Sequence, residues 1–187
     1  MMRNFFIFVF ELVKVVVVSL VIIIPIRYFL IQPFYVKGAS MEPNFYDHEY
    51  LIIDEISYRF GELKRGEVIV FRYPRNPQEY FIKRVVGLPG EKIQIKDGSV
   101  YIFNKEHAEG IVLEEPYLAA GVKTYNTMEG IIALKENEFF VLGDNRNSSK
   151  DSRSFGAVER SFVIGRVMLR GWPFDRAGFF AAPAYDF

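Results

Sequence analysis

The N-terminal segment places the strongest constraint on what this chain can fold into. From Phe5 to Ile31 it is dominated by valine, isoleucine, phenylalanine and leucine, interrupted by Glu11, Lys14 and Arg27. A helix needs about 20 apolar residues to cross the hydrocarbon core of a bilayer. The stretch Leu12–Ile31 reaches that length and places Lys14 and Arg27 near its two ends, where long side chains extend to the headgroups. The segment therefore predicts one transmembrane helix.

Two other interpretations of this segment fit less well. A cleaved secretory signal has an apolar region of about 7–15 residues followed by a small-x-small cleavage site, and none follows promptly here. A buried helix needs a domain able to surround it, and the rest of the chain is small. We therefore expect residues 1–32 to be an uncleaved anchor. Its orientation is not set by charge, because Arg3 and Lys14 on one side balance Arg27 and Lys37 on the other.

Beyond the anchor, residues 33–187 show short runs of alternating apolar and polar residues that are rich in β-branched and aromatic side chains. The Asp97-Gly98 pair between two such runs is a strong hairpin signal. We expect a mostly β domain, an antiparallel and partly closed barrel, with residues 104–135 as an insertion between core strands. The expected strands lie at 49–56, 67–73, 80–87, 92–103 and 138–144.

Composition excludes several functions. The formal net charge is zero and no long basic run occurs, so we expect no nucleic-acid partner. The chain has no cysteine, which excludes cysteine nucleophiles and thiolate metal sites. An acidic group shows no metal-ligand spacing and is interpreted as solvated surface, so no metal and no cofactor are expected. This group is Asp47, Glu49, Asp54 and Glu55.

Ser40, in a short turn after the anchor, is a candidate nucleophile that needs a general base. His48 has acidic neighbours in a solvated turn, and His107 lies in the weakly ordered insertion, so neither is well placed. Lys83 is the better candidate, because on an alternating strand it shares a face with Phe81 and Val85.

Apolar neighbours would desolvate the Lys83 amine and lower its pKa from about 10.4 toward 7–8, which arginine cannot match. On spacing alone, an ordinary strand lysine that extends to water is the commoner interpretation.

Four blocks in this order, behind an N-terminal anchor, resemble the type I signal peptidase family of membrane-bound serine proteases. Each is weak alone, and together they are specific. The resemblance covers nearly the whole chain except the insertion and the C-terminal tail. The blocks are GASMEP (38–43), RGEVIVF (65–71), FIKRVVGLPG (81–90) and GDNRNSSKDSR (143–153).

The resemblance implies a catalytic dyad in which Ser40 is the nucleophile and Lys83 the general base. It implies that the Ser149 hydroxyl hydrogen-bonds and orients the lysine. Gly38 stands where some members have a serine that helps form the oxyanion hole, which leaves the second donor open. Further matches are a structural ion pair, Asp151 and Arg153, and two residues that shape the site, Asp144 and Arg146. Without the family, the 143–153 loop is a polar surface turn.

The family also implies the substrate: signal peptides of exported preproteins, cut after a small-x-small motif. The positions that match shallow apolar pockets are Phe34, Val36, Met41, Phe81 and Ile82. We expect a single-pass protein of the plasma membrane, in contact with the bilayer, with its catalytic domain on the extracytoplasmic side.

The aromatic C-terminal tail either contacts the membrane interface or packs on the β-domain. The alternative function is a membrane-anchored β-domain that binds peptides without cutting them. A self-cleaving repressor of related chemistry is disfavoured, since the chain has an anchor in place of a DNA-binding domain.

Overall fold

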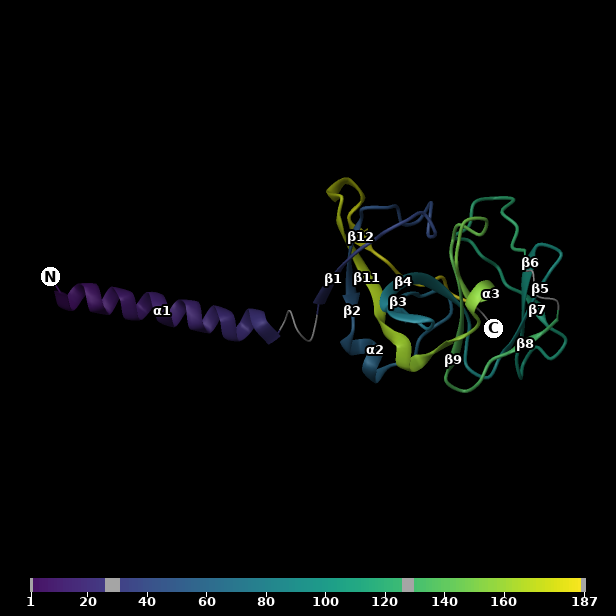
Figure 1. The fold of residues 1–187 in the computed structure, drawn as a ribbon, viewed down its shortest axis with the longest axis horizontal. Helices are drawn as coiled ribbons and strands as arrows, with labels where there is room; N and C mark the ends of the chain where they lie inside the picture. The colour runs from purple at the N-terminus through teal and green to yellow at the C-terminus, as the bar shows by residue number, and fades with distance from the viewer. Residues whose placement is uncertain (1, 26–30, 126–129, 186–187) are drawn as a thin grey trace.

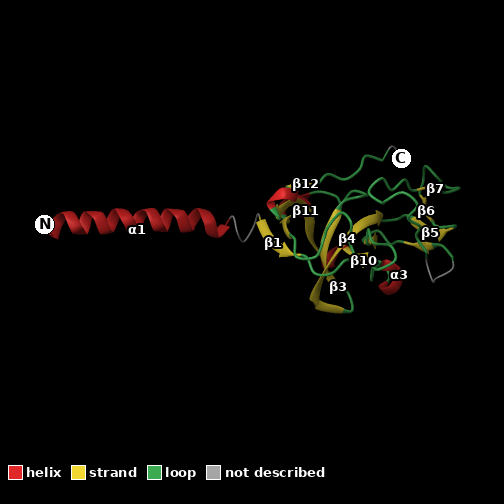
Figure 2. Ribbon diagram, turned by 90° about the horizontal axis from the view of Figure 1, so that it is seen from above, coloured by secondary structure: helices red, strands yellow, loops and turns green. Residues whose placement is uncertain are grey.

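The computed structural model describes residues 2–25, 31–125 and 130–185. One long helix, α1 (Met2–Pro25), stands apart from a β-rich body that holds the other described elements (Figures 1 and 2). Its segment Phe5–Ile24 is long and apolar enough to cross a membrane, and none of it is buried in the protein. The β body therefore leaves this apolar helix uncovered.

The boundaries expected for the membrane span, Leu12–Ile31, are wrong. The described part of the helix ends at Pro25. Ile31 belongs instead to the first strand, where it pairs with Asp54. Arg27, expected near the end of the span, lies outside the described residues.

The main sheet has eight antiparallel strands in the order β1-β2-β11-β3-β4-β9-β10, with β12 pairing with β11. Some strands that are adjacent in this sheet are far apart in the sequence, because β11 lies between β2 and β3. Its strands are β1 (Ile31–Tyr35), β2 (Tyr50–Asp54), β3 (Val68–Tyr73), β4 (Asn76–Gly87), β9 (Glu138–Leu142), β10 (Val158–Glu159), β11 (Val163–Trp172) and β12 (Gly178–Phe179).

A second antiparallel sheet has four strands in the order β7-β6-β5-β8. Its bounds are β5 (Lys92–Lys96), β6 (Ser99–Phe103), β7 (Ile111–Val112) and β8 (Ile132–Ala133). The expected hairpin joins β5 to β6, and both turn residues, Asp97 (φ 55°) and Gly98 (φ 84°), have the positive φ that this tight turn requires. Residues 104–135 supply β7 and β8, which extend this sheet on both sides.

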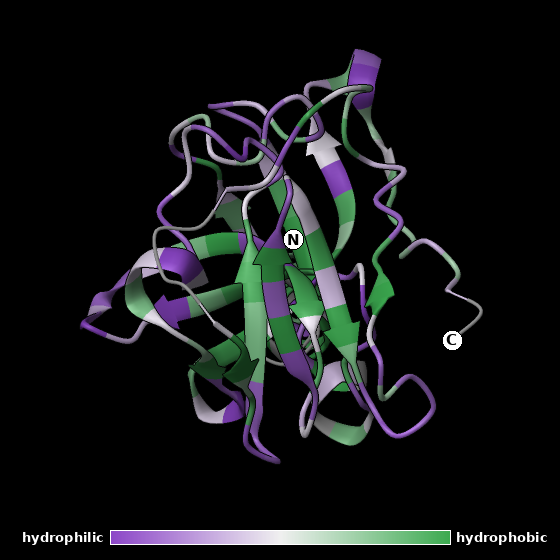
Figure 3. Ribbon diagram, turned by 90° about the vertical axis from the view of Figure 1, so that its right-hand side faces the viewer, coloured by the Kyte–Doolittle hydropathy of each residue, from purple (hydrophilic) through white to green (hydrophobic). Residues whose placement is uncertain are grey.

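The expected fold class is confirmed: the body is mostly antiparallel β and its sheets are not closed. Apolar and polar residues alternate along the strands in Figure 3. The helical elements of the body are short: α2 (Ile56–Phe60), α3 (Ser152–Phe155), η2 (Arg160–Phe162) and η3 (Phe174–Arg176).

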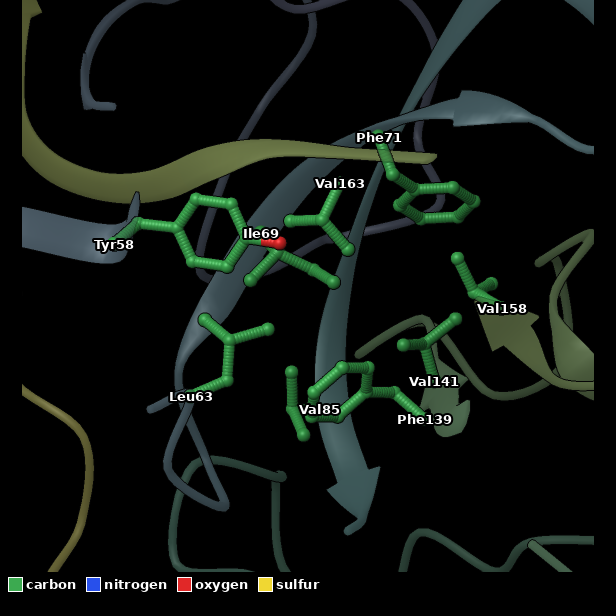
Figure 4. Packing of buried hydrophobic residues seen from close by; sticks show 9 residues of the cluster. All are labelled: Tyr58, Leu63, Ile69, Phe71, Val85, Phe139, Val141, Val158 and Val163. Carbon is green, nitrogen blue, oxygen red and sulfur yellow. The ribbon is translucent and has the colours of Figure 1, made fainter. Parts of the chain in front are cut away.

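Three apolar clusters hold the body together. The first joins α2 to β3, β4, β9, β10 and β11, and Figure 4 shows its buried residues facing one another. The second fixes the turn after β1, through Met41 and Phe45, to β2 and β3. The third packs the second sheet onto the main one, with Ile93 and Ile102 against Phe140. Each large side chain buried in this way stabilises the fold by about 1.5–3 kcal/mol.

The aromatic tail is packed on the β body in part, as one of the two expectations has it. Phe174 and Phe179 are 77% and 79% exposed. Phe180 packs on Phe45 with ring centroids 4.5 Å apart, and Tyr185 packs against the third cluster. Part of the tail is therefore fixed to the β body while other rings face solvent.

Candidate active site

Ser40 lies on the turn that connects β1 to β2, and this turn is packed against the apolar core. Met41 and Phe45, one and five residues later, are 1% and 0% exposed. Gly38 adopts a φ of +88°, a conformation that side chains other than glycine rarely take. Its N–H donates to Asp47 Oδ1 at 2.9 Å. The turn thus presents Ser40 while its flanks are fixed, and the Gly38 N–H is already engaged.

Lys83 reaches Ser40 from the neighbouring part of the main sheet. It lies on β4, is 4% exposed, and is paired with Ile69 of β3. Its Nζ lies 2.7 Å from Ser40 Oγ and also donates to the carbonyl oxygen of Ile82 at 2.7 Å. The structure therefore brings together the two residues expected to form the dyad.

Burial lowers the pKa of the Lys83 amine from 10.5 to about 8. The negative charges of Asp151 and Asp144 oppose this change, because they stabilise the ammonium form. A substantial fraction of Lys83 is then neutral at mildly alkaline pH. A neutral amine next to a hydroxyl is what a general base requires.

The 143–153 loop closes over this pair from β9. A Cβ on Gly143 would collide with the Ser149 hydroxyl and with the backbone oxygen of Ser40, so the loop and the nucleophile turn touch at a position that admits glycine alone. Ser149 Oγ is buried against Gly143, and among the described residues its one interaction is with Asp151, whose pKa it lowers. The hydrogen bond expected from Ser149 to Lys83 is not formed here, where the lysine donates to Ser40 and Ile82.

Asp151 and Arg153 form the expected ion pair, with Arg153 Nη2 2.8 Å from Asp151 Oδ2. Asp151 also accepts from the N–H of Gly143 at 3.1 Å and caps the N-terminus of α3. Burial raises the pKa of Asp151, but Arg153, the N–H of Gly143 and the Ser149 hydroxyl together hold it below its usual range. The pair thereby fixes both ends of the loop.

Asp144 and Arg146 anchor the loop to two other parts of the fold. Asp144 receives two hydrogen bonds from Arg84, at 2.8 and 2.6 Å, and both side chains are buried. Arg146 pairs with Glu115 at 2.5 Å and bonds Thr124, so it holds the chain between β7 and β8. Burial lowers the pKa of Arg146, but the hydrogen bonds and negative charge of Glu115 raise the pKa of Arg146 above its usual value.

Three residues that the sequence did not single out complete the site. Arg84 stacks on Tyr117, 4.0 Å from the ring centroid. Asn44 donates to Asp144 at 2.8 Å and so ties the nucleophile turn to the same ion pair. Asn145 donates to the carbonyl oxygens of both Ala39 and Ser40 at 3.1 Å. Their roles depend on contacts between distant segments, which leave no signal in local sequence.

A cavity of about 540 Å³ opens beside the dyad. Both dyad residues and four of the five expected pocket residues line it, and Met41 does not, because it is buried in the core. The lining residues are Phe34, Tyr35, Val36, Lys37, Ser40, Leu51, Val70, Glu79, Tyr80, Phe81, Ile82, Lys83 and Lys150. The histidines are not part of this lining, and His48 is exposed and paired with Asp47. The cavity presents apolar walls to whatever approaches Ser40.

Known proteins give the following matches. The family model for signal peptidase, peptidase S26, matches residues 9–172. A probable signal peptidase I-2 of Synechocystis sp. is 38% identical over 173 residues, covering 90% of this chain and 75% of its own. A signal peptidase IB of Staphylococcus aureus is 32% identical over 171 residues, covering 86% and 87%. A crystal structure of a signal peptidase I from Enterococcus faecalis is 33% identical, with a TM-score of 0.45, and covers 57% of this chain and 97% of that one.

Proposed function

Because the chain belongs to the type I signal peptidases of the S26 peptidase family, we propose that it removes signal peptides from exported preproteins as a serine peptidase with a Ser40–Lys83 dyad. The observation that carries this proposal is the 2.7 Å separation of Lys83 Nζ from Ser40 Oγ in a buried site where the lysine pKa is about 8. This arrangement places a nucleophile and a general base within hydrogen-bond distance of each other.

In the proposed reaction, neutral Lys83 takes the proton of Ser40 while Oγ attacks the scissile carbonyl carbon. The tetrahedral intermediate carries its oxyanion toward the N–H of Ser40. The Lys83 ammonium then protonates the leaving amine, which departs and leaves an acyl-enzyme. Lys83 next removes a proton from water, the resulting hydroxide attacks the ester, and Ser40 recovers its proton.

Ser149 is proposed to support the lysine during this cycle. A lysine ammonium has three N–H donors, and two of them are engaged by Ser40 and Ile82. Ser149 contributes a buried hydroxyl that lowers the pKa of Asp151 and has no other interaction among the described residues, so its oxygen can still accept a hydrogen bond. We assign Ser149 to the third donor once Lys83 is protonated.

The substrate is proposed to bind extended in the cavity, with small side chains before the scissile bond. Phe34, Val36 and Ile82 are large and apolar, so they favour alanine-like residues over charged ones. The exposed edge of β1 offers backbone groups to a peptide strand, since β1 pairs with β2 on one side and ends the sheet on the other.

Residues 1–32 are proposed as the membrane anchor and residues 33–187 as the peptidase domain, which contains the 104–135 insertion. The apolar segment Phe5–Ile24 supports the anchor, although β1 already begins at Ile31. A single pass through the plasma membrane would place the β body on the extracytoplasmic side, where the proposed substrates emerge. Ser40 lies 16 residues after Ile24 in the sequence, and a chain of that length spans at most about 55 Å even when fully extended, which limits how far the site lies from the bilayer.

The test uses the full chain in detergent and a purified precursor with a signal peptide, with cut sites located by mass. A single cut after a small-x-small triplet is expected. Ser40→Ala and Lys83→Met should each reduce the rate on the order of 1000-fold or more, while the exposed changes Ser161→Ala and Lys96→Gln should not. A precursor that binds but stays intact with the wild-type chain would favour a peptide-binding module instead.

A further inference from the structure

Asn145 holds the backbone on both sides of the nucleophile. Its side-chain amide donates to the carbonyl oxygen of Ala39 at 3.1 Å, and its own backbone N–H donates to the carbonyl oxygen of Ser40, also at 3.1 Å. Because the Ala39 acceptor is a carbonyl oxygen, the side-chain amide must present its NH₂ group to it and not its oxygen. One residue of the 143–153 loop therefore fixes the two peptide planes that flank Ser40.

The bond to Ala39 has a consequence for the N–H of Ser40. The carbonyl of Ala39 and the N–H of Ser40 belong to the same planar trans peptide unit, in which the two groups point in opposite directions. Two donors hold this carbonyl, the Asn145 side chain at 3.1 Å and the N–H of Glu42 in the same turn at 3.2 Å, and only Asn145 ties it to the loop, so the N–H of Ser40 points away from the loop. Ser40 lines the cavity and Asn145 does not, so that opposite direction is the side of the substrate.

The N–H of Ser40 is also unengaged within the described part of the chain, where no backbone or side-chain acceptor pairs with it. The nearby N–H of Gly38 donates to Asp47 and offers nothing to a substrate. With glycine at position 38, no side chain there supplies a second donor. The stabilisation of an oxyanion then depends strongly on how well the Ser40 N–H is aimed.

We propose that Asn145 is a positioning residue of the oxyanion hole, which aims the Ser40 N–H by holding the carbonyl of Ala39. The proposal rests on the serine-peptidase function proposed above. It assigns to Asn145 an effect on the transition state, where the oxyanion exists, and little effect on binding of the uncleaved peptide.

The test compares Asn145→Ala and Asn145→Leu, neither of which adds a charge near Lys83, with Asn147→Ala, an exposed asparagine of the same loop, in the full chain. Both variants keep the backbone N–H of residue 145 and lose only the side-chain donor. Removal of an oxyanion donor itself costs about 100- to 1000-fold in kcat. Because Asn145 acts through the donor, kcat should fall about 10- to 100-fold with KM within about twofold. Asn147→Ala should match the wild type.

A second readout separates positioning from general damage to the fold. A peptide aldehyde ending in alanine reacts reversibly with Ser40. The Ser40 Oγ bonds to the aldehyde carbon and its proton passes to Lys83. The former aldehyde oxygen then carries the negative charge and is an oxyanion. The matching peptide alcohol binds without this bond. The Asn145 variants should weaken the aldehyde in proportion to kcat, leave alcohol affinity unchanged, and keep the pH profile of kcat/KM.

Three results would overturn the proposal. Full kcat in Asn145→Ala would show that the Ser40 N–H is aimed without it. Equal weakening of aldehyde and alcohol would show a structural role, and a displaced pH profile would show action through Lys83. If the wild-type chain binds the aldehyde no better than the alcohol, the serine mechanism itself fails, and the role of Asn145 with it.

Discussion

The amine of Lys83 lies 2.7 Å from the hydroxyl of Ser40, although the two residues are 43 positions apart in the chain. Strand β4 supplies the lysine and the turn after β1 supplies the serine. The same burial that brings them together lowers the lysine pKa to about 8. Position and protonation state thus have one structural cause, and the following predictions depend on it.

The first prediction concerns the pH dependence of cleavage. Because the base form of Lys83 is required, kcat/KM should rise about tenfold per pH unit below pH 8 and level off above it. Rates measured from pH 6 to 10 on a substrate without titratable groups near the cut test this. Lys96→Gln, on the exposed hairpin, should leave the profile unchanged. A rise centred near pH 6.5 would point to a histidine as the base.

The second prediction concerns stability. Between pH 8 and 10.5 the unfolded chain keeps the proton on Lys83 while the folded chain releases it, so the contribution of Lys83 to the unfolding free energy rises with pH in this window. The total change is about 3 kcal/mol, and below pH 8 the full penalty remains.

Lys83→Met lacks this titration, so its stability relative to the wild type should fall as the pH rises from 8 to 10.5. Denaturant unfolding of both chains at several pH values measures the difference, in which the other groups cancel. A difference that stays constant over this range would show that the folded Lys83 titrates like an ordinary lysine.

The third prediction concerns the contact between the loop and the nucleophile turn. Gly143→Ala introduces a Cβ into space occupied by the Ser149 hydroxyl and the Ser40 carbonyl oxygen. Overpacking of this kind costs about 1–3 kcal/mol, and here the displaced groups adjoin the dyad, so kcat should fall at least tenfold. Gly178→Ala is the control, because nothing lies within 4 Å of its added Cβ. Wild-type turnover in Gly143→Ala would contradict the proposed close packing.

The fourth prediction concerns the buried pair of Arg84 and Asp144. Asp144→Asn leaves the guanidinium without its charge partner, which in a buried pair costs about 3–5 kcal/mol. Thermal or denaturant unfolding measures the loss. The comparison is the pair of the exposed Lys135 with the half-buried Glu138, where Lys135→Gln should cost no more than about 1 kcal/mol. Equal effects of the two changes would mean that the buried pair contributes nothing beyond a surface pair.

The sequence alone predicts many strands of the β body, because these strands are bounded by turns and alternate apolar with polar residues. The β5–β6 hairpin followed from Asp97-Gly98. Strand β11 was missed because glycine and arginine interrupt its pattern. A Cβ added to Gly165 would lie only 2.6 Å from the backbone oxygen of Asp54, so this position needs glycine. Arg166 forms ion pairs with Glu67 and Asp54. Tertiary contacts explain these residues, and local propensity does not.

The candidate site was predictable in part for a similar reason. An apolar strand face around Lys83 follows from alternation, but its approach to Ser40 does not, and the family resemblance supplied that pairing. Asn44, Arg84 and Asn145 were absent from the prediction, because their hydrogen bonds span 100, 60 and 106 residues. A polar residue in a turn is usually solvated, so nothing local distinguishes one that reaches a distant carbonyl.

The last prediction concerns charge at the mouth of the cavity. Lys150 is exposed, lines the cavity, and lies 4.3 Å from the Tyr73 ring centroid. Its Nζ is 5.8 Å from the Phe81 ring centroid, and the Nζ of Lys83 is 5.3 Å from the same point. A substrate residue that reaches this ring is therefore close to a cation, and an acidic side chain there should be preferred to a basic one.

Matched peptides that differ by glutamate or lysine at single positions around the scissile bond measure this preference as a ratio of kcat/KM. At one position the wild type should favour glutamate about two- to fivefold, and Lys150→Glu should reverse the ratio, since exposed ion pairs are worth about 0.2–1 kcal/mol. The effect should shrink in high salt. Lys96→Glu, which changes net charge equally but far from the cavity lining, should leave the ratio unchanged. If Lys96→Glu shifts the ratio as much as Lys150→Glu does, the preference comes from overall charge and not from Lys150.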